Sequence, residues 1–118
     1  MTSIFERIMA REIPAEFVYE DDLVVVIHDI APKAPIHLLV VPRTPVFRDV
    51  VALAAGDPAL LAHVVEVAKQ VALEHTGGDF RLVFNSGAGA GQTVFHVHAH
   101  VLGNVPGEAL GEESLGDL

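Results

Sequence analysis

The chain has 118 residues, of which 51% are hydrophobic and 19% are charged, enough for one compact domain with a real core. Seven basic and sixteen acidic side chains give a formal net charge of −9, which argues against bulk electrostatic binding of a nucleic-acid backbone. The sequence has no cysteine, which excludes disulfides and thiolate zinc sites, and no apolar run that predicts a membrane span or a signal peptide. The expected location is the cytoplasm.

The first predicted elements are a short helix and three strands. Ser3 followed by Glu6 has the spacing of a capping box and predicts a helix over 4–10. Apolar, β-branched runs predict strands over 17–19, 24–28 and 37–41. Prolines at 32 and 35 predict a loop before the third strand, because proline cannot donate a ladder hydrogen bond.

The second half predicts one long helix and two more strands. Asp57-Pro58 combines an N-cap with proline at the first helical position, so a helix is expected from 58 to about 75, before Gly77-Gly78. Strands are expected over 80–85 and 94–102, with a glycine-rich loop over 87–91 between them. The predicted fold class is α+β, a five-stranded antiparallel sheet with one long and one short helix. An exposed sheet edge on so apolar a chain favours a homodimer across which the sheet extends.

The last residues differ in composition from the rest. Residues 104–118 contain four acidic side chains and four glycines or prolines, but no Lys or Arg. We expect residues 1–103 to form the folded domain and residues 104–118 an acidic tail that is poorly ordered or depends on a partner.

Three histidines alternate with apolar residues at positions 96, 98 and 100. On a strand this period of two places the imidazoles on one face, with neighbours about 6.8 Å apart at Cα, and the intervening residues on the other face. One interpretation is a solvated polar face. A second is a metal site, with His37 as a further ligand. A third is nucleophilic catalysis at phosphorus, for which a neutral imidazole oriented by a fixed acceptor is suited.

The loop directly before the histidines favours the third interpretation. Its glycines at 87, 89 and 91 permit an anion-binding nest of main-chain N–H groups, and Gln92 and the Thr93 hydroxyl follow. Such a run is weak evidence by itself, and it lacks the Lys-Ser/Thr of a P-loop. Together, the glycines and the histidines predict a phosphate site.

The segment His96-Val97-His98-Ala99-His100-Val101-Leu102 resembles the His-φ-His-φ-His-φ-φ signature of the histidine triad (HIT) superfamily of nucleotide hydrolases and transferases. The likeness extends over nearly all of the chain up to Gly103. Within the superfamily, the sequence resembles the Hint branch, the purine nucleoside phosphoramidases. Transferase branches of the superfamily tend to have glutamine at the position of the third histidine. The presence of His100 there therefore favours hydrolysis. Further motifs that carry the likeness are Ile4-Phe5, Glu12-Ile13-Pro14, Glu20-Asp21-Asp22, His28-Asp29-Ile30, Ala34-Pro35-Ile36-His37, Val41-Pro42, Asn85 and Gly91-Gln92.

The resemblance implies an activity and a set of catalytic residues. The expected enzyme is a cytoplasmic, homodimeric hydrolase that cleaves a P–N or related bond at the α-phosphate of a purine nucleoside 5′-monophosphate, with no metal and no cofactor. His98 is the implied nucleophile, which gives a nucleotidyl-histidine intermediate. His96 is implied to orient it, and His100 and His37 to lie beside the phosphate or the attacking ring. Thr93 is implied near the leaving group.

The resemblance also implies a binding site for the nucleotide. Phosphate oxygens are expected at Asn85, at the Gly91-Gln92 region and at Thr93, and Asp29 is expected to accept hydrogen bonds from the ribose hydroxyls. The implied apolar slot for the base consists of Ile4, Phe5, Ile8, Ile27, Ile30 and Leu39. Without the resemblance, Phe5, Ile8, Ile27 and Leu39 are interpreted as core, and a turn cap before Pro32 is an equally good interpretation of Asp29.

Two other functions stay open at this point. The chain also fits a dinucleoside polyphosphate hydrolase of the same superfamily, or a non-catalytic nucleotide-binding or interaction protein whose acidic tail binds a partner. Thr93 replaces a frequent serine of the family but keeps the hydroxyl, and Ile27 replaces a frequent aromatic residue, which leaves the base preference open. The resemblance implies that the C-terminus shapes the choice of leaving group, and because the tail after Gly103 has no tryptophan or basic residue, the leaving group stays undefined.

Overall fold

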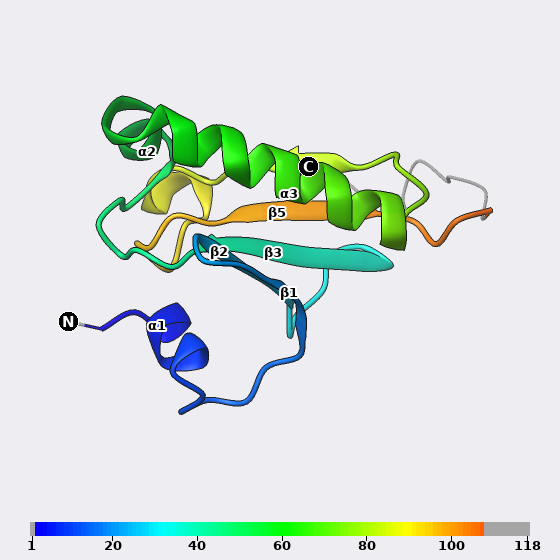
Figure 1. The fold of residues 1–118 in the computed structure, drawn as a ribbon, viewed down its shortest axis with the longest axis horizontal. Helices are drawn as coiled ribbons and strands as arrows, with labels where there is room; N and C mark the ends of the chain where they lie inside the picture. The colour runs from blue at the N-terminus through cyan, green and yellow to red at the C-terminus, as the bar shows by residue number, and fades with distance from the viewer. Residues whose placement is uncertain (1, 108–118) are drawn as a thin grey trace.

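The computed structural model describes residues 2–107, which form a five-stranded antiparallel sheet with three helices (Figure 1). The strand order is β1-β2-β3-β5-β4. The strands are β1 (Phe17–Glu20), β2 (Val24–His28), β3 (Ile36–Pro42), β4 (Arg81–Val83) and β5 (Ala99–Gly103). The helices are α1 (Ile4–Met9), α2 (Val50–Gly56) and α3 (Pro58–His75), with one 3-10 turn, η1 (Ala88–Ala90). The α+β class and the five-stranded antiparallel sheet are thereby confirmed.

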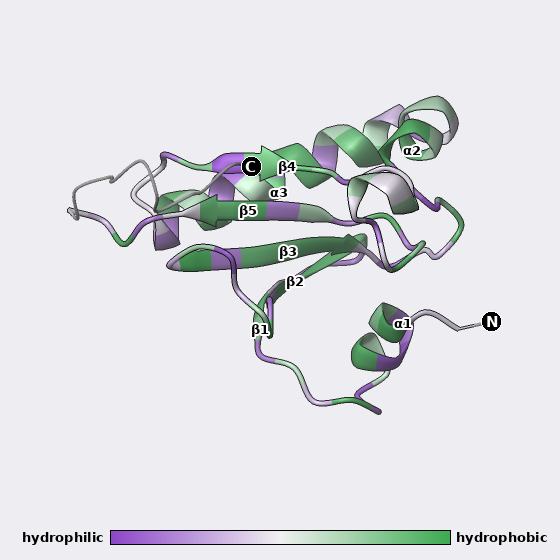
Figure 2. Ribbon diagram, turned by 180° about the vertical axis from the view of Figure 1, so that it is seen from behind, coloured by the Kyte–Doolittle hydropathy of each residue, from purple (hydrophilic) through white to green (hydrophobic). Residues whose placement is uncertain are grey.

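Side chains alternate along the strands and form a hydrophobic core on each face of the sheet. The α3-side core contains Val24 and Val26 of β2 and Leu38 and Val40 of β3, packed against α3. The α1-side core contains the alternate residues of these strands and two residues of α1: Phe5, Ile8, Val25, Ile27, Leu39 and Val41. Figure 1 shows α2 and α3 over one face and α1 over the other, and Figure 2 shows β2 and β3 as largely hydrophobic strands. Burial on both faces explains why these strands are largely apolar, with His28 and His37 as the polar residues.

Two helices begin where the sequence predicts. The Ser3 hydroxyl accepts the Glu6 N–H at 3.1 Å, and the Glu6 carboxylate accepts the Ser3 N–H at 2.9 Å, which completes the capping box. The Asp57 carboxylate accepts the Leu60 N–H at 3.0 Å and caps α3, which ends at His75. None of the helices within residues 2–107 combines the length and the hydropathy that crossing a bilayer requires.

The sequence analysis was wrong about several boundaries. It missed α2, which Asp49 caps through the Ala52 N–H at 2.9 Å. Residues 94–98 were expected in the last strand, but β5 begins only at Ala99, because the Val97 N–H donates to the Phe47 carbonyl at 2.9 Å and not to a neighbouring strand. The expected strand over 80–85 is limited to β4. Most of the expected tail, residues 108–118, lies outside the described residues.

Candidate active site

Four histidines gather on the α1 side of the sheet, where β3 pairs with β5. The His98 and His100 rings lie 5.2 Å apart between centroids, and the His37 and His100 rings 5.1 Å apart. The intervening residues Val97 and Ala99 lie in the α3-side core, so the predicted alternation is present even though the strand starts late. His96 and His37 are buried, and His98 and His100 are partly buried.

The His98 ring is held with one nitrogen free. Its Nδ1 lies 2.9 Å from the His96 carbonyl oxygen, and since a carbonyl only accepts, Nδ1 carries the proton. The lone pair of a neutral His98 is therefore on Nε2. Burial lowers the pKa of His98, against the opposing effect of the bond to the His96 carbonyl. The neutral, nucleophilic form is thus favoured at neutral pH.

The His96 ring is fully buried and is bonded at both nitrogens. Its Nε2–H donates to the Pro42 carbonyl at 2.6 Å, and its Nδ1 accepts the Ser3 hydroxyl at 2.7 Å. Burial lowers the pKa of His96 more than the bond to the Pro42 carbonyl raises it. The hydrogen bond to His98 comes from the backbone of His96, while its ring anchors that backbone to β3 and to the N-terminus of α1.

His37 and His100 form a second oriented pair. The Lys33 N–H donates to His37 Nδ1 at 2.9 Å, so the proton of His37 is on Nε2, which lies 2.9 Å from His100 Nδ1 and 3.3 Å from an Asp29 oxygen. A neutral His100 that accepts on Nδ1 then has a donor proton on Nε2. Burial is the largest of the effects that lower the pKa of His100 to about 4. The positive charges of protonated His98 and His37 add to this lowering of the pKa.

Asp29, His37 and His100 are the one group of metal-ligand type that the described part of the chain brings together, with donor atoms within 4.8 Å of one another. A metal ion needs a lone pair from each ligand. The nitrogen of His37 that faces this group bears a proton as long as Lys33 donates to the other nitrogen. The geometry therefore favours a hydrogen-bond relay over a metal site.

A pocket of about 330 Å³ opens beside His98 and His100. This volume lies within the range of small-molecule sites. The predicted site residues that line it are Ile4, Phe5, Ile8, Ile27, Asp29, Ile30, Leu39, Asn85, Gly91, Thr93, His98 and His100. Segments from both halves of the chain thus meet at one pocket with an apolar wall and a polar wall.

Some pocket residues were not predicted, and one predicted residue lies at the rim. Ile13, Pro14, Ala15, His28 and Val94 also line the pocket. The motif Glu12-Ile13-Pro14 was noted for its family likeness, but its place beside the base slot depends on the turn after α1. Ile30 is 93% exposed, so it borders the opening and does not pack into a closed wall.

Three of the predicted site residues do not line the pocket: His96, His37 and Gln92. Gln92 is buried, and its amide donates to the Arg48 carbonyl at 2.6 Å and the Val94 carbonyl at 3.0 Å, while its oxygen accepts the Gly87 N–H at 2.8 Å. Its side chain therefore holds the glycine loop in place. Gly87 and Gly91 both have φ of 91°, a conformation that favours glycine.

Asp29 and Asn85 are each fixed by the backbone at the pocket wall. One Asp29 oxygen accepts the Ala31 N–H at 2.8 Å, which is the turn-capping arrangement, while the other faces His37. The Asn85 amide donates to the Ala90 carbonyl at 2.9 Å. Both side chains thus reach the pocket in defined orientations.

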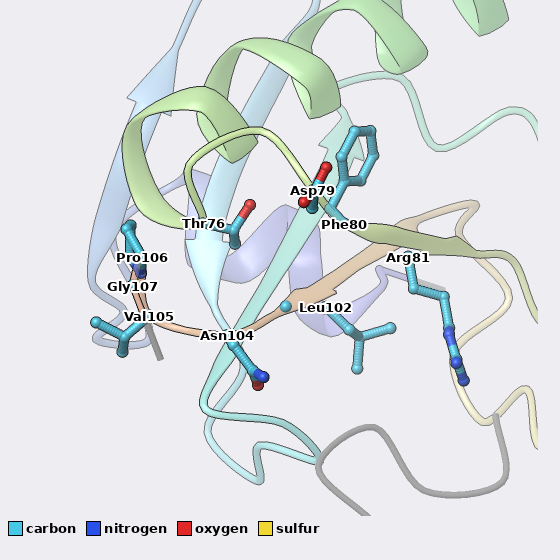
Figure 3. Close-up of a pocket in the computed structure, with 10 residues that line it drawn as sticks. Thr76, Asp79, Phe80, Arg81, Leu102, Asn104, Val105, Pro106 and Gly107 are labelled. Atoms are coloured by element: carbon cyan, nitrogen blue, oxygen red, sulfur yellow. The ribbon is translucent and has the colours of Figure 1, made fainter. Parts of the chain in front are cut away.

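A second pocket, of about 400 Å³, lies between the end of α3, the start of β4 and the end of β5 (Figure 3). Figure 3 shows Thr76 beside the end of α3, with Arg81 and Leu102 on adjacent strands. None of the predicted site residues lines this pocket. The chemistry that the sequence predicts is therefore concentrated in the first pocket.

Comparison with known proteins gives one consistent family. The sequence model of the HIT domain matches residues 10–107. An uncharacterised HIT-like protein of Synechocystis is 50% identical over 105 residues, covering 88% of this chain and 91% of that protein. The purine nucleoside phosphoramidase of Escherichia coli is 38% identical over 108 residues, covering 88% of each. The structure of a HIT family hydrolase from Clostridium thermocellum has a TM-score of 0.80 and 36% identity, covering 92% of this chain and 96% of that one.

Proposed function

The chain belongs to the HIT domain family, and we propose that it hydrolyses a P–N or related bond at the α-phosphate of a purine nucleoside 5′-monophosphate. The observation that carries the proposal is the state of His98. The His96 carbonyl holds the proton on Nδ1, and the ring lines a pocket that Gly91, at the end of the glycine loop, also lines. The phosphoramidase of Escherichia coli, at 38% identity, supports the bond type and the purine.

The proposed reaction has two displacements at phosphorus. The Nε2 lone pair of His98 attacks the α-phosphorus, and the bond to the leaving nitrogen breaks, so that the amine departs with that electron pair and gains a proton. Water then attacks the same phosphorus, the P–Nε2 bond breaks, and the monophosphate is released. The water gives up a proton in this step, and the electron pair of the broken bond returns to His98.

The surrounding residues have separate proposed roles. The Nε2–H of His100 and the second hydrogen of the Asn85 amide provide donors for the phosphate oxygens, where negative charge develops. The Gly91 N–H already donates to the Ala88 carbonyl at 3.0 Å, so Gly91 contributes a wall without a side chain that the phosphate can approach closely. The Thr93 hydroxyl serves the leaving group. Asp29 accepts hydrogen bonds from the ribose hydroxyls, and the apolar wall of the pocket contacts the purine.

The test is turnover of adenosine 5′-phosphoramidate with and without a chelator. We expect wild type to release adenosine monophosphate equally well under both conditions, and His98→Ala to lose at least about 10³-fold in kcat. His63→Ala is the matched control, because His63 pairs with Asp21 at 2.6 Å and does not line the pocket. Retained activity in His98→Ala, or loss of activity on chelation, contradicts the proposal.

Other substrates and trapping of the intermediate separate the alternatives. A dinucleoside polyphosphate turned over faster than the phosphoramidate would identify the polyphosphate hydrolase. Tight binding of adenosine monophosphate with no turnover of either substrate would identify a binding protein. Wild type denatured at alkaline pH, where the P–N bond to histidine is stable, should carry a nucleotidyl group on His98, detected by mass spectrometry, and His98→Ala should carry none.

The proposal includes a homodimer and a two-part chain. The antiparallel sheet of residues 2–107 has two edge strands, β1 and β4, and an edge strand is where a sheet can extend across a dimer. Residues 1–103 are the proposed catalytic domain and residues 104–118 an acidic tail. Sedimentation equilibrium should give twice the mass of one chain, and a single-chain mass at micromolar concentration would contradict the dimer.

A further inference from the structure

The hydroxyl of Ser3 has a second partner besides the helix that it caps. Its oxygen accepts the Glu6 N–H at 3.1 Å, as an N-cap does, and lies 2.7 Å from His96 Nδ1, 93 residues away in sequence. Nδ1 has no proton to donate, because that proton is on Nε2, bonded to the Pro42 carbonyl. Ser3 is therefore the donor in this bond.

This bond links the start of α1 to the backbone that orients His98. The His96 ring is fully buried, so the Ser3 hydroxyl supplies the hydrogen bond that its Nδ1 requires. The carbonyl of the same residue accepts the Nδ1–H of His98 at 2.9 Å. His96 thus connects the N-cap of α1 to the proposed nucleophile: its ring accepts a hydrogen bond from Ser3, and its backbone carbonyl accepts one from His98.

Phe5 forms a second link over the same route. Its ring meets the His96 ring edge-on, with centroids 5.6 Å apart, and the His98 ring with centroids 4.9 Å apart. Phe5 is held by α1, two residues after the N-cap. Any change in how Ser3 anchors α1 to His96 will therefore also shift the aromatic ring that contacts His98.

We infer that Ser3 is a positioning residue, whose hydroxyl fixes the ring of His96 and thereby the direction in which His98 Nε2 points. This inference deepens the proposed function and rests on it. Without the hydroxyl, the buried Nδ1 of His96 has no donor, and leaving it unpaired costs free energy. A rotated ring, or a ring with its proton on the other nitrogen, then becomes more favourable. The His96 carbonyl and His98 then lose their fixed alignment.

The activity test compares three variants that separate capping from positioning. Ser3→Ala removes the cap and the donor, and we expect kcat to fall about tenfold with a smaller change in KM. Ser3→Thr keeps the hydroxyl and should restore kcat to within about threefold of wild type. Glu6→Ala breaks the other half of the capping box but leaves the bond to His96, so it should retain kcat within about twofold. Equal losses in Ser3→Ala and Glu6→Ala would overturn the inference, because Ser3 would then act only as a cap.

Nitrogen-15 NMR of the imidazoles tests the inference without turnover. In wild type, the spectrum should show His96 protonated on Nε2 and His98 on Nδ1. Ser3→Ala should move the resonances of both rings, whereas Ser3→Thr should leave them near the wild-type positions. Glu6→Ala removes a charge that raises the pKa of His96, so it can shift the His96 resonances slightly, but each ring should keep its proton on the same nitrogen as in wild type. If wild type hydrolyses neither substrate, the proposed function fails, and these spectra still decide the role of Ser3. Unchanged spectra in a folded Ser3→Ala would overturn it.

Discussion

Asp29 places one carboxylate next to three imidazoles, and its charge affects all of them. It raises the pKa of His37, His98 and His100, although burial outweighs it in each case. Asp29→Asn keeps the shape and removes the charge, so these pKa values should fall further. The acid limb of kcat/KM, which reports protonation of the proposed nucleophile His98, should then move to lower pH. Asp79→Asn, in the second pocket, is the control that should not move it.

The same substitution tests the proposed ribose contact. A hydrogen bond to a charged group contributes roughly 1.5–3 kcal/mol, so the Kd for adenosine monophosphate should rise at least about tenfold in Asp29→Asn. The 2′-deoxy nucleotide, measured by calorimetry, should lose much less affinity on this substitution. Equal losses for both nucleotides would show that Asp29 does not contact the 2′-hydroxyl.

Gln92 should matter for stability more than its distance from the pocket suggests. Gln92→Leu keeps the approximate volume but leaves two carbonyls and the Gly87 N–H without partners. We expect a loss of about 3 kcal/mol in the free energy of unfolding, measured by urea denaturation. A change below about 1 kcal/mol would mean that water replaces the amide.

At the residue scale, the sequence predicts the residues that line the pocket better than the hydrogen bonds that hold those residues in place. The histidine row and the glycine loop stand out by residue type and spacing, whereas Asp29, Asn85 and the apolar residues of the pocket were predicted only because the family resemblance implies them. The supporting bonds of Gln92 and Ser3 end on groups 44 and 93 residues away, respectively. No local pattern encodes such partners. They depend on how β3, the loop after it and the histidine segment come together.

Among the elements, α3 and β5 meet at one close contact. A Cβ added at Gly103 would lie 2.6 Å from Thr76 Cγ2 and 3.2 Å from the Asp79 carbonyl oxygen. Gly103→Ala should therefore destabilise the protein by about 1–3 kcal/mol, measured by thermal or urea unfolding. Thr76→Ser removes Cγ2 but keeps the hydroxyl that donates to the Ala72 carbonyl, so adding it to Gly103→Ala should recover part of the loss. A strictly additive double variant would contradict this account.

The elements that the sequence predicted well are those with local signals. Ser3 and Asp57 cap α1 and α3, and the β-branched runs of β2 and β3 are buried on both faces. α2 was missed because Val50 and Val51 have low helix propensity, although Asp49 was an available capping signal. Alternation in residues 94–98 looked like strand, but a strand also needs a neighbour to pair with, and that condition is tertiary.

For the whole molecule, the buried histidines predict loss of stability in acid. Burial lowers the pKa of His37, His96, His98 and His100 below the usual 6.5, and that of His100 to about 4. Below pH 6.5 the unfolded chain therefore binds more protons than the folded one. The stabilisation is complete above this pH and is lost as pH falls through the lowered values. Tm should decrease steadily from pH 7 to pH 4.

A variant separates this effect from general acid denaturation. His100→Asn removes the group with the lowest of these resolved pKa values, so its Tm should fall less steeply over the same pH range. Asp21 also loses stabilising bonds in acid. Burial opposes its ionisation, but hydrogen bonds from Val24, Leu23, His63 and Tyr19 keep the pKa of this carboxyl well below its usual value. Its contribution disappears only at still lower pH. If the plots of Tm against pH were parallel for wild type and His100→Asn, protonation of His100 would not be a cause of the acid destabilisation.

The division of the interior by the sheet has a practical consequence for protein engineering. The residues of the α3-side core and the outward face of α3, including exposed Val65 and Leu73, do not line the first pocket. Redesign of that half, for heat resistance or soluble expression, therefore changes none of the residues that line the first pocket. Substitutions intended to change the substrate are instead best made in α1, in the segment after α1 and in the loop over 29–35. The two objectives can be pursued in separate rounds and then combined in one gene.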